Sequence, residues 1–473
     1  MRKEHDFLGE MEIPDDVYYG VQTLRAMENF KISARTADVF LIHAMGMVKK
    51  AAALANMKTG RLDKTIGIAL VQAADEVISG KLDEQFPLDA IQGGAGTSFN
   101  MNINEVITNR ALEILGHAKG DYDYISPNNH ANMAQSTNDV IPTSIRLAIL
   151  LRTELLLEAL DKLSQAFAAK GEEFKDIVKM GRTHLQDAVP ITLGAEFTAF
   201  ASSVHRSMSR IHRNSQELNI INMGATAVGT GLNADPAYIK YVAEYLSEIS
   251  GFAFTTAENL MDATSNTDIF TDVSGALRVT ALALIKICND LRLMASGPRA
   301  GLSEIILPPR QPGSSIMPGK INPVIPEVVD QTCYQVIGND LAVVFGVENG
   351  QFQLNVMEPV MAHNIFSSFR YLTNAVTTFR KLCVEGIKAN PKMCEFWFHR
   401  SIGIVTALLP HIGYEACSAL AKEALTKDLQ IRDLIIEKGI MSKEQLDIIF
   451  APDQFMHPGI AGSSLLKNEA KNF

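Results

Sequence analysis

The sequence is poor in cysteine and tryptophan. Its 473 residues include one tryptophan and five cysteines (Cys288, Cys333, Cys383, Cys394 and Cys417), which are scattered and form no Cys-x-x-Cys pair. An odd number of isolated cysteines argues against a disulfide framework and indicates reduced thiols in the core. We therefore expect a cytoplasmic protein.

The segments that mark secreted, membrane and nucleic-acid-binding proteins are also missing. The N-terminus, Met1-Arg-Lys-Glu-His-Asp, is charged and no apolar segment follows it, which argues against a signal peptide. No run reaches the roughly 18 uninterrupted apolar residues of a membrane-spanning helix. The formal net charge of −10, with no basic block, gives no support to a nucleic-acid partner.

Several motifs that fix a reaction class by their spacing are absent as well. No His-Glu-x-x-His motif or Cys/His cluster has metal-ligand spacing, so we expect no metal site. The loop from Gly313 is not a phosphate-binding P-loop, because five residues separate Gly313 from Gly319 and Ile321 follows Lys320. The same loop contains no Gly-x-Ser-x-Gly elbow of a serine hydrolase.

Long helical patterns dominate what is present. Hydrophobic residues are 47% and charged residues 20% of the chain, which is the balance of a globular protein with more than one domain. Apolar residues recur at helical spacing from Val39 onward, and alternation of period two is scarce. Residues 1–30 are expected to be irregular. We predict a mostly α fold around a long-helix bundle, with helices over 145–174, 193–220, 271–296, 326–348 and 359–389.

Five polar loops, at 91–105, 126–143, 181–190, 222–235 and 313–322, interrupt the helices. The first runs from a glycine cluster into a helix, which favours anion binding, although capping by Thr97 or Ser98 explains it equally well. In the second, Pro142 suits the first turn of the next helix. In the third, His184 is a candidate acid, base or ligand-binding group, although a lone histidine is often structural. The fourth lacks a preceding strand pattern, which argues against a dinucleotide site.

The side chains in these loops are mostly neutral hydrogen-bond donors. Such a set suits a small dianion held by many hydrogen bonds, and it suits redox chemistry or phosphoryl transfer poorly. Gly313 and Gly319 can serve as hinges of an active-site lid, with an ordinary surface loop as the alternative. The donors are Thr97, Ser98, Ser136, Thr137, Asn138, Thr183, Ser314, Ser315 and Asn322, and Lys320 and His184 add cationic or titratable groups.

The segment Gly313-Ser-Ser-Ile-Met-Pro-Gly-Lys-Ile-Asn-Pro323 resembles the signature loop of the fumarase/aspartase superfamily. Other loops match that superfamily in the same order: Gly-Gly-Ala-Gly-Thr-Ser at 93–98, Gln-Ser-Thr-Asn-Asp at 135–139 and Gly-Arg-Thr-His-Leu-Gln-Asp-Ala at 181–188. The resemblance covers nearly the whole chain. Ala134 and Ile321 stand where Ser and Val are usual, and both departures are conservative.

Within the superfamily the chain resembles the aspartate ammonia-lyases more than the class II fumarases. The segment Tyr18-Tyr-Gly-Val-Gln-Thr-Leu-Arg, the Gly-Gly-Ala-Gly-Thr loop and the Ser-Thr-Asn triplet at 136–138 are all aspartase-like. The resemblance implies a lyase that removes ammonia from L-aspartate by reversible anti-elimination, giving fumarate through an aci-carboxylate carbanion. The alternative is fumarase activity, which converts L-malate to fumarate and water. The superfamily also includes a lens crystallin, but intact Ser314, Lys320, Asn322 and His184 favour an enzyme.

The resemblance also implies an architecture and partners. A mostly α subunit of the fumarase/aspartase type would have an N-terminal domain at 1–138, a central helical bundle at 139–393 and a small C-terminal domain at 394–473. Four subunits would form a homotetramer in which each active site is shared by three chains. The partners are then the small molecules L-aspartate, fumarate and ammonium, with no nucleic acid and no membrane. No cofactor would be required, while activation by a divalent metal such as Mg²⁺ stays open.

The resemblance assigns roles residue by residue. Ser314 would be the base that removes the Cβ proton, with Lys320, His184 and Glu327 completing the catalytic set and Glu327 orienting His184. The alternative for Glu327 is an ordinary first-turn carboxylate after Pro326, favoured by the helix dipole. The substrate contacts would be Thr97, Ser136, Thr137 and Ser315 to the β-carboxylate, Thr183, Lys320 and Asn322 to the α-carboxylate, and Asn138 and His184 to the amino group, with Ser98 also counted as substrate-binding.

Overall fold

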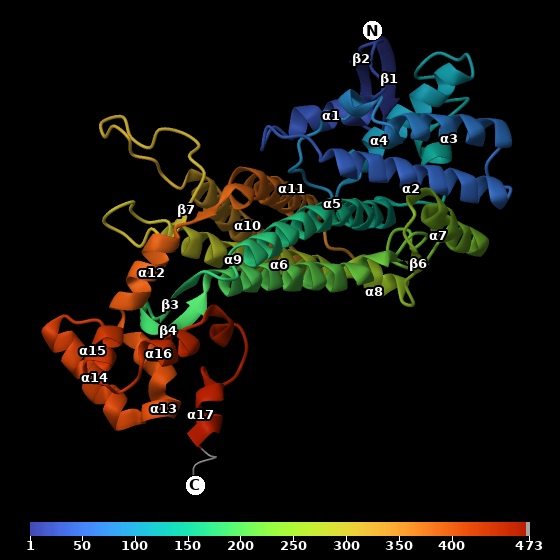
Figure 1. Ribbon diagram of the computed structural model, residues 1–473. Coiled ribbons are helices and arrows are strands. Elements are labelled where there is room, and N and C mark those ends of the chain that lie inside the picture. Colours follow the sequence, from blue (N-terminus) through green and yellow to red (C-terminus); the bar gives the residue numbers. More distant parts are fainter. Residues whose placement is uncertain (470–473) are drawn as a thin grey trace. The chain divides into compact units, whose positions relative to one another are not determined.

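The computed structural model describes residues 1–469 and is built almost entirely of helices (Figure 1). The chain forms two compact units, each assembled from separate stretches of sequence. The first unit contains Met1–Glu158, Ser209–Ala281 and Cys333–Thr373, and the second contains Ala159–Met208, Leu282–Thr332 and the chain from Asn374 onward. The predicted division at 1–138, 139–393 and 394–473 stays a prediction, and residues 470–473 of its last domain lie outside the described residues.

The first 30 residues are regular, so their prediction as irregular was wrong. Strands β1 (Arg2–Asp6) and β2 (Gly9–Ile13) form an antiparallel hairpin, and helix α1 (Val21–Asn29) follows. Charged contacts hold this hairpin: the buried Glu4 carboxylate accepts from Arg2 Nε at 2.7 Å and from Tyr122 Oη at 2.9 Å. These strands were not predicted because they carry charges where an apolar alternation would be expected.

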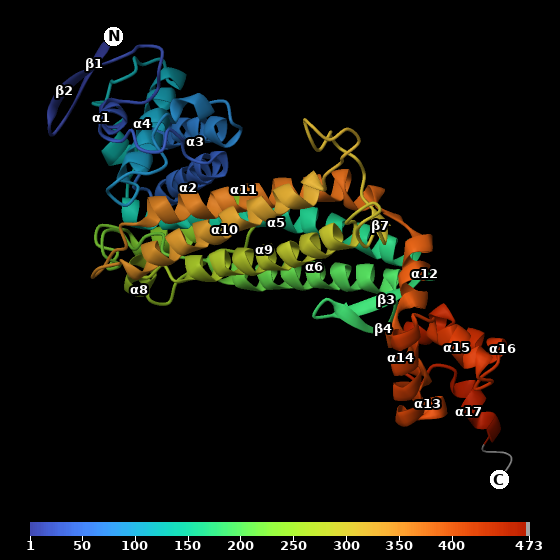
Figure 2. The ribbon, with the colours of Figure 1, turned by 90° about the vertical axis from the view of Figure 1, so that its left-hand side faces the viewer.

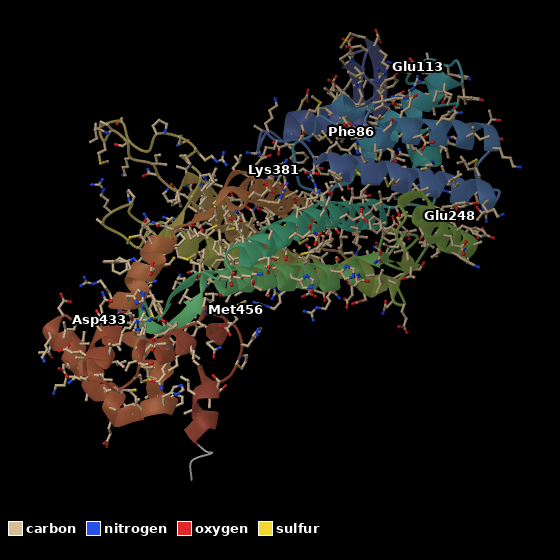
Figure 3. The ribbon with its side chains drawn as sticks, viewed as in Figure 1. Phe86, Glu113, Glu248, Lys381, Asp433 and Met456 are labelled. Carbon is tan, nitrogen blue, oxygen red and sulfur yellow. The ribbon has the colours of Figure 1, made fainter. Side chains whose placement is uncertain are left out.

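Three helices form the rest of the N-terminal part of the first unit. Helices α2 (Val39–Lys58), α3 (Lys64–Ile78) and α4 (Thr97–Ile114) lie side by side in Figure 1. Asp38 and Asp63 begin α2 and α3 as N-caps, because their carboxylates accept backbone N–H groups of the first turn. At the other end of α4, Glu113 accepts a hydrogen bond from Tyr18 Oη at 2.6 Å (Figure 3).

Five long helices confirm the predicted bundle. They are α5 (Thr137–Glu173), α6 (Leu193–Ser215), α9 (Ile269–Met294), α10 (Val324–Glu348) and α11 (Glu358–Leu382). In the first unit, Asn339 of α10 donates to Ser368 of α11 at 3.1 Å. In the second, the ring of Phe167 on α5 lies 6.2 Å from that of Phe197 on α6. Helix α5 begins eight residues before the predicted start at 145, so Pro142 lies inside the helix and not in its first turn.

Shorter elements complete both units. The first unit also contains β5 (Ile220–Ile221), α7 (Pro236–Ser250), β6 (Thr255–Thr256) and α8 (Leu260–Ser265). The second contains the hairpin β3 (Val178–Thr183) and β4 (Gln186–Thr192), together with β7 (Ile305–Ile306) and β8 (Lys388–Ala389). Its C-terminal helices, seen together in Figure 2, are α12 (Pro391–Arg400), α13 (Leu409–Ile412), α14 (Tyr414–Lys427), α15 (Ile431–Glu437), α16 (Lys443–Ile449) and α17 (Ser463–Glu469).

The C-terminal helices have a hydrophobic cluster of their own. Phe398, Leu408, Leu420, Ile435 and Leu446 are members of this cluster, and each is at most 5% exposed. All five cysteines are buried and none forms a disulfide, as predicted. Within residues 1–469, no helix combines the length and apolar character needed to cross a membrane.

Candidate active site

The predicted site residues divide between the two units. The first unit holds Thr97, Ser98, Ser136, Thr137 and Asn138, and the second holds Thr183, His184, Ser314, Ser315, Lys320, Asn322 and Glu327. Their convergence on one substrate stays a prediction.

The glycine cluster at 93–96 leads directly into α4. The N-cap residue of α4 is Gly96, with φ of 82°. Glycine has no side chain, so no side-chain hydrogen bond caps this helix. The prediction that Thr97 or Ser98 caps it was therefore wrong. A Cβ on Gly96 would lie 3.0 Å from the side chain of Ile141, so both the backbone angle and the close approach require glycine. Thr97 and Ser98 are therefore the first two residues of α4, where a helix presents backbone N–H groups without intrahelical partners.

The start of α5 is held by a reciprocal cap. Ser136 Oγ accepts the N–H of Asn138 at 3.2 Å, and Asp139 Oδ1 accepts the N–H of Ser136 at 2.9 Å. The second oxygen of Asp139 accepts the N–H groups of Gly224 and Thr226 at 3.2 and 3.0 Å, which ties the loop at 222–235 to this helix start. Burial raises the pKa of the Asp139 carboxyl to about 7, and these N–H donors oppose the rise.

Pro142 leaves one carbonyl of α5 without its helical partner. Because proline has no N–H, it cannot bond the carbonyl of Asn138 four residues earlier. The Nδ2 of the buried Asn222 donates to that carbonyl at 3.0 Å instead. Asn138 Nδ2 in turn donates to the carbonyl of Ala227 at 2.7 Å, which leaves its amide oxygen as the acceptor that can face a ligand.

A hollow of about 470 Å³ opens beside this helix start. Ser136 and Thr137 are the predicted site residues that line it. Its other walls come from α4, from the segment 132–135 and from the loop at 222–235, and they include Asn100, Asn132, Thr226 and Asn233. Ala134, Thr226 and Asn233 have φ of 60°, 59° and 71°, a conformation rare outside glycine, so the walls are strained at three places.

A buried lysine lies behind this hollow. Lys49 of α2 is 1% exposed, and its Nζ donates to Asn132 Oδ1 at 3.1 Å and to Gln135 Oε1 at 2.8 Å. Asn132 Oδ1 also accepts from Asn100, whose amide lies 3.3 Å from Thr137 Oγ1. Burial lowers the pKa of the Lys49 ammonium to about 7, and the Asp139 carboxylate opposes that shift.

His184 lies at the tip of the hairpin formed by β3 and β4. Thr183 pairs with Gln186, so His184 and Leu185 are the two turn residues, with φ of 53° and 62°. Positive φ at both positions defines a type I′ turn, which usually carries asparagine and glycine. Residues 181–190 were predicted as a loop and are instead this hairpin. Both Thr183 and His184 are exposed.

Ion pairs anchor the stem of this hairpin. The buried Lys179 ammonium lies 2.7 Å from Glu196 and 2.8 Å from Glu304, and Arg182 lies 2.8 Å from Glu304. Two cations therefore share the buried Glu304 carboxylate. This arrangement fixes the strands while the tip, where Leu185 is 70% exposed, remains in solvent.

The loop at 313–322 closes on itself at its neck. The N–H of Gly313 donates to the carbonyl of Lys320 at 2.7 Å, and Asn322 Nδ2 donates to the carbonyl of Gly313 at 2.9 Å. Within the loop, Ser314 Oγ accepts the N–H groups of Ile316 and Met317 at 3.2 and 3.0 Å. Two donors on one hydroxyl oxygen favour its deprotonated form over the neutral one.

The outer part of the loop is open to solvent. Ser315 and Lys320 are exposed, and Ile316 is 84% exposed although it is apolar. Glu327, in the first turn of α10, accepts a hydrogen bond from Gln331 at 3.3 Å. Among the ion pairs of residues 1–469, none joins His184 to Glu327, so their pairing stays a prediction for chains in an assembly.

Three parts of the site were not assigned from the sequence. They are Lys49, the amides Asn100 and Asn132, and the loop at 222–235, which forms a wall of the hollow. Lys49 carried no usable signal in the sequence, because it stands next to Lys50 in a helix that also contains His43, Asn56 and Lys58. Within the described chain, no group of three or more His, Cys, Asp or Glu side chains is arranged to hold a metal ion.

Known proteins resemble this chain over nearly its whole length. Residues 9–338 match the family described as lyase, and residues 404–457 match the one described as fumarase C C-terminus. An aspartate ammonia-lyase from a Bacillus sp is 56% identical over 98% of this chain and 99% of its own length. The aspartate ammonia-lyase of Bacillus subtilis is 54% identical over 98% of both chains. A crystal structure described as fumarate lyase:delta crystallin from Brucella melitensis bound to cobalt is 50% identical, with a TM-score of 0.94 over 97% of this chain and all of its own.

Proposed function

We propose that this chain, which belongs to the lyase family, catalyses the reversible elimination of ammonia from L-aspartate to give fumarate. The two Bacillus aspartate ammonia-lyases described above are 56% and 54% identical to it over nearly their whole length. The alternative, elimination of water from L-malate, is supported by the match of residues 404–457 to the fumarase C C-terminus.

The reaction requires a base for a weakly acidic Cβ proton and donors for the charge that develops. Ser314 supplies the base, and the observation that supports it is the pair of backbone N–H groups at its Oγ. The alkoxide takes the Cβ proton, and the electron pair spreads into the neighbouring carboxylate as an aci-carboxylate. That pair then forms the double bond as the carbon–nitrogen bond breaks and ammonia leaves. Donors placed for the intermediate stabilise it more than the substrate.

The remaining residues hold the three polar groups of the substrate. The β-carboxylate is held by hydroxyls of Thr97, Ser136, Thr137 and Ser315, with Ser98 beside them at the start of α4. The α-carboxylate is held by Thr183, Lys320 and Asn322. Asn138 and His184 contact the leaving amino group, and Glu327 orients His184.

These roles require residues from both units to contact one substrate. A homotetramer in which each active site is shared by three chains brings such residues together. Two observations support it: the predicted residues divide between two units, and α10 carries an exposed apolar stripe. Tyr334, Leu341 and Phe345 are 54–55% exposed and, with Gly338, follow the 4-3-4 spacing of a helix seam. We place the protein in the cytoplasm. The reaction as proposed requires no cofactor. Addition of Mg²⁺ or EDTA to the activity assay tests whether a divalent metal activates the enzyme.

The base is tested by Ser314→Ala, with Ser202→Ala, an exposed serine on α6, as the matched control. We expect Ser314→Ala to lose about a hundredfold to ten-thousandfold in turnover, because general acid–base catalysis contributes about 10²–10⁴-fold. Its oligomeric state and its binding of succinate should be retained, and Ser202→Ala should resemble the unaltered protein. Unchanged turnover of Ser314→Ala would reject Ser314 as the base.

A further inference from the structure

A second cavity, of about 510 Å³, lies in the first unit, and none of the predicted site residues lines it. Its walls come from the segment 34–39, the beginning of α2, and facing parts of α5 and α11. Three arginines line it, Arg35, Arg152 and Arg370, together with His363. Asp38 is the only carboxylate among its lining residues.

The Asp38 carboxylate is already paired within the protein. Its carboxylate caps α2 by accepting the N–H of Phe40 at 3.1 Å, and its two oxygens accept from Arg152 Nη2 at 2.7 and 2.6 Å. Arg370 reaches it only at 3.9 Å. The cavity lining therefore carries two more guanidinium charges than carboxylate charges, in a chain whose formal net charge is −10.

Some N–H groups of the cavity arginines have no hydrogen-bond partner in the described part of the chain. Arg152 lies over the ring of Phe40 at 4.2 Å, and its Nε is buried yet has no hydrogen-bond partner within residues 1–469. The guanidinium of Arg35 has no hydrogen bond or ion pair to the described part of the chain.

The pKa of the half-buried His363 indicates the electrostatic character of the cavity. Burial lowers its pKa, the nearby charges of Arg35 and Arg370 lower it further, and Asp89 and Asp38 oppose them. The lining therefore disfavours an additional positive charge. The same field favours an anion, because guanidinium groups bind carboxylate and phosphate oxygens through paired N–H donors.

We propose that this cavity is a binding site for a small oxyanion with at least two negative charges, held by Arg35 and Arg370 beside the paired Arg152. Its volume is that of a small-molecule site. Carboxylate and phosphate groups share the chemistry that the arginines recognise, and the ligand is either a dicarboxylate or a phosphate compound. The inference does not depend on the proposed lyase activity, since its residues are separate from those assigned to the reaction.

Isothermal titration calorimetry of the full chain tests this site with two probes, inorganic phosphate and succinate, at constant ionic strength. The variants are Arg35→Gln and Arg370→Gln, which remove charges without breaking the pair between Asp38 and Arg152. Arg61→Gln is the matched control, because Arg61 is an arginine of the same unit with a side chain 67% exposed. Succinate is titrated into Lys320→Ala and into Lys320→Ala combined with each arginine variant, so that binding at the candidate active site is weakened throughout.

We expect one saturable site per chain for at least one probe. Each of Arg35→Gln and Arg370→Gln should raise its Kd about tenfold, since a charge-assisted hydrogen bond contributes about 1.5–3 kcal/mol and 1.4 kcal/mol is a factor of ten. Arg61→Gln should leave Kd unchanged. Binding of phosphate alone identifies a phosphate site, and binding of succinate with the same arginine dependence identifies a dicarboxylate site. No saturable binding of either probe, or binding insensitive to both arginine variants with circular dichroism unchanged, would overturn the proposal.

Discussion

Replacing Asn222 with alanine should destabilise the protein by an amount that depends on Pro142. The Nδ2 of Asn222 donates to the carbonyl of Asn138 and to Thr264 Oγ1, both at 3.0 Å, and the residue is 1% exposed. Asn222→Ala leaves the Asn138 carbonyl with neither a helical nor a side-chain donor. An unsatisfied buried polar group costs about 1–3 kcal/mol, and the lost contact to Thr264 adds to that, so we expect a total loss of about 3 kcal/mol.

The second arm of the test is Pro142→Ala, which restores an N–H at position 142. That N–H can donate to the Asn138 carbonyl in the ordinary helical pattern, so Asn222→Ala should cost less in the Pro142→Ala background. We expect a coupling of about 1 kcal/mol or more between the two positions, within the range found for residues that share a partner. The free energy of unfolding is measured by urea titration of all four proteins at one protein concentration, because assembly shifts apparent stability.

An exposed asparagine provides the control. Asn349→Ala removes a single hydrogen bond, from Asn349 Nδ2 to the carbonyl of Phe345, at a solvent-exposed position. Its effect should stay within about 0.5 kcal/mol. If Asn222→Ala costs the same with proline and with alanine at 142, the account of the Asn138 carbonyl is refuted.

The remaining predictions concern the site and one buried carboxyl. Lys320→Ala should weaken succinate binding at the candidate active site about tenfold or more, because a charge-assisted hydrogen bond is lost, and an unaltered affinity would count against the α-carboxylate role. Mixing inactive Thr137→Ala and Lys320→Ala proteins should restore part of the activity through hybrid sites; no recovery after verified subunit exchange would place each site within one chain. Burial raises the pKa of Glu105 to about 7, so the folded state holds its proton more tightly than the unfolded state. The stability of the unaltered protein relative to Glu105→Gln should therefore fall as pH rises from about 4.5 to 7, and urea titrations giving the same difference at both ends would reject the shift.

The long helices could be predicted because their apolar residues repeat along one face. The starts of α6, α9, α10 and α11 lie within two residues of their predicted positions. The start of α5 was missed because its first turn is polar and precedes a proline. Only a tertiary contact, from Asn222, makes a helix through Pro142 acceptable.

Both long hairpins were missed because their stability comes from distant partners. The strand at Arg2–Asp6 depends on Glu4 and Tyr122, which are far apart in the sequence. The hairpin at 178–192 turns through His184 and Leu185, which are not typical residues of a type I′ turn, and its stem depends on Glu304. No local sequence pattern predicts such contacts.

The site shows the same division between local and distant information. Polar loops and their resemblance to a known family identified the hydroxyls and amides, including Ser314, whose backbone donors only the structure reveals. The supporting network of Lys49, Asn132 and Asn100 lies behind these loops on other helices, where a polar residue is indistinguishable from a surface residue in sequence.

The most direct test of the proposed function follows fumarate by its ultraviolet absorbance after the protein is added to L-aspartate, with L-malate as the parallel substrate. Fumarate from L-aspartate and none from L-malate is the result we predict. Fumarate from L-malate alone would make the protein a fumarase, and a folded protein that forms fumarate from neither substrate would contradict the proposed elimination.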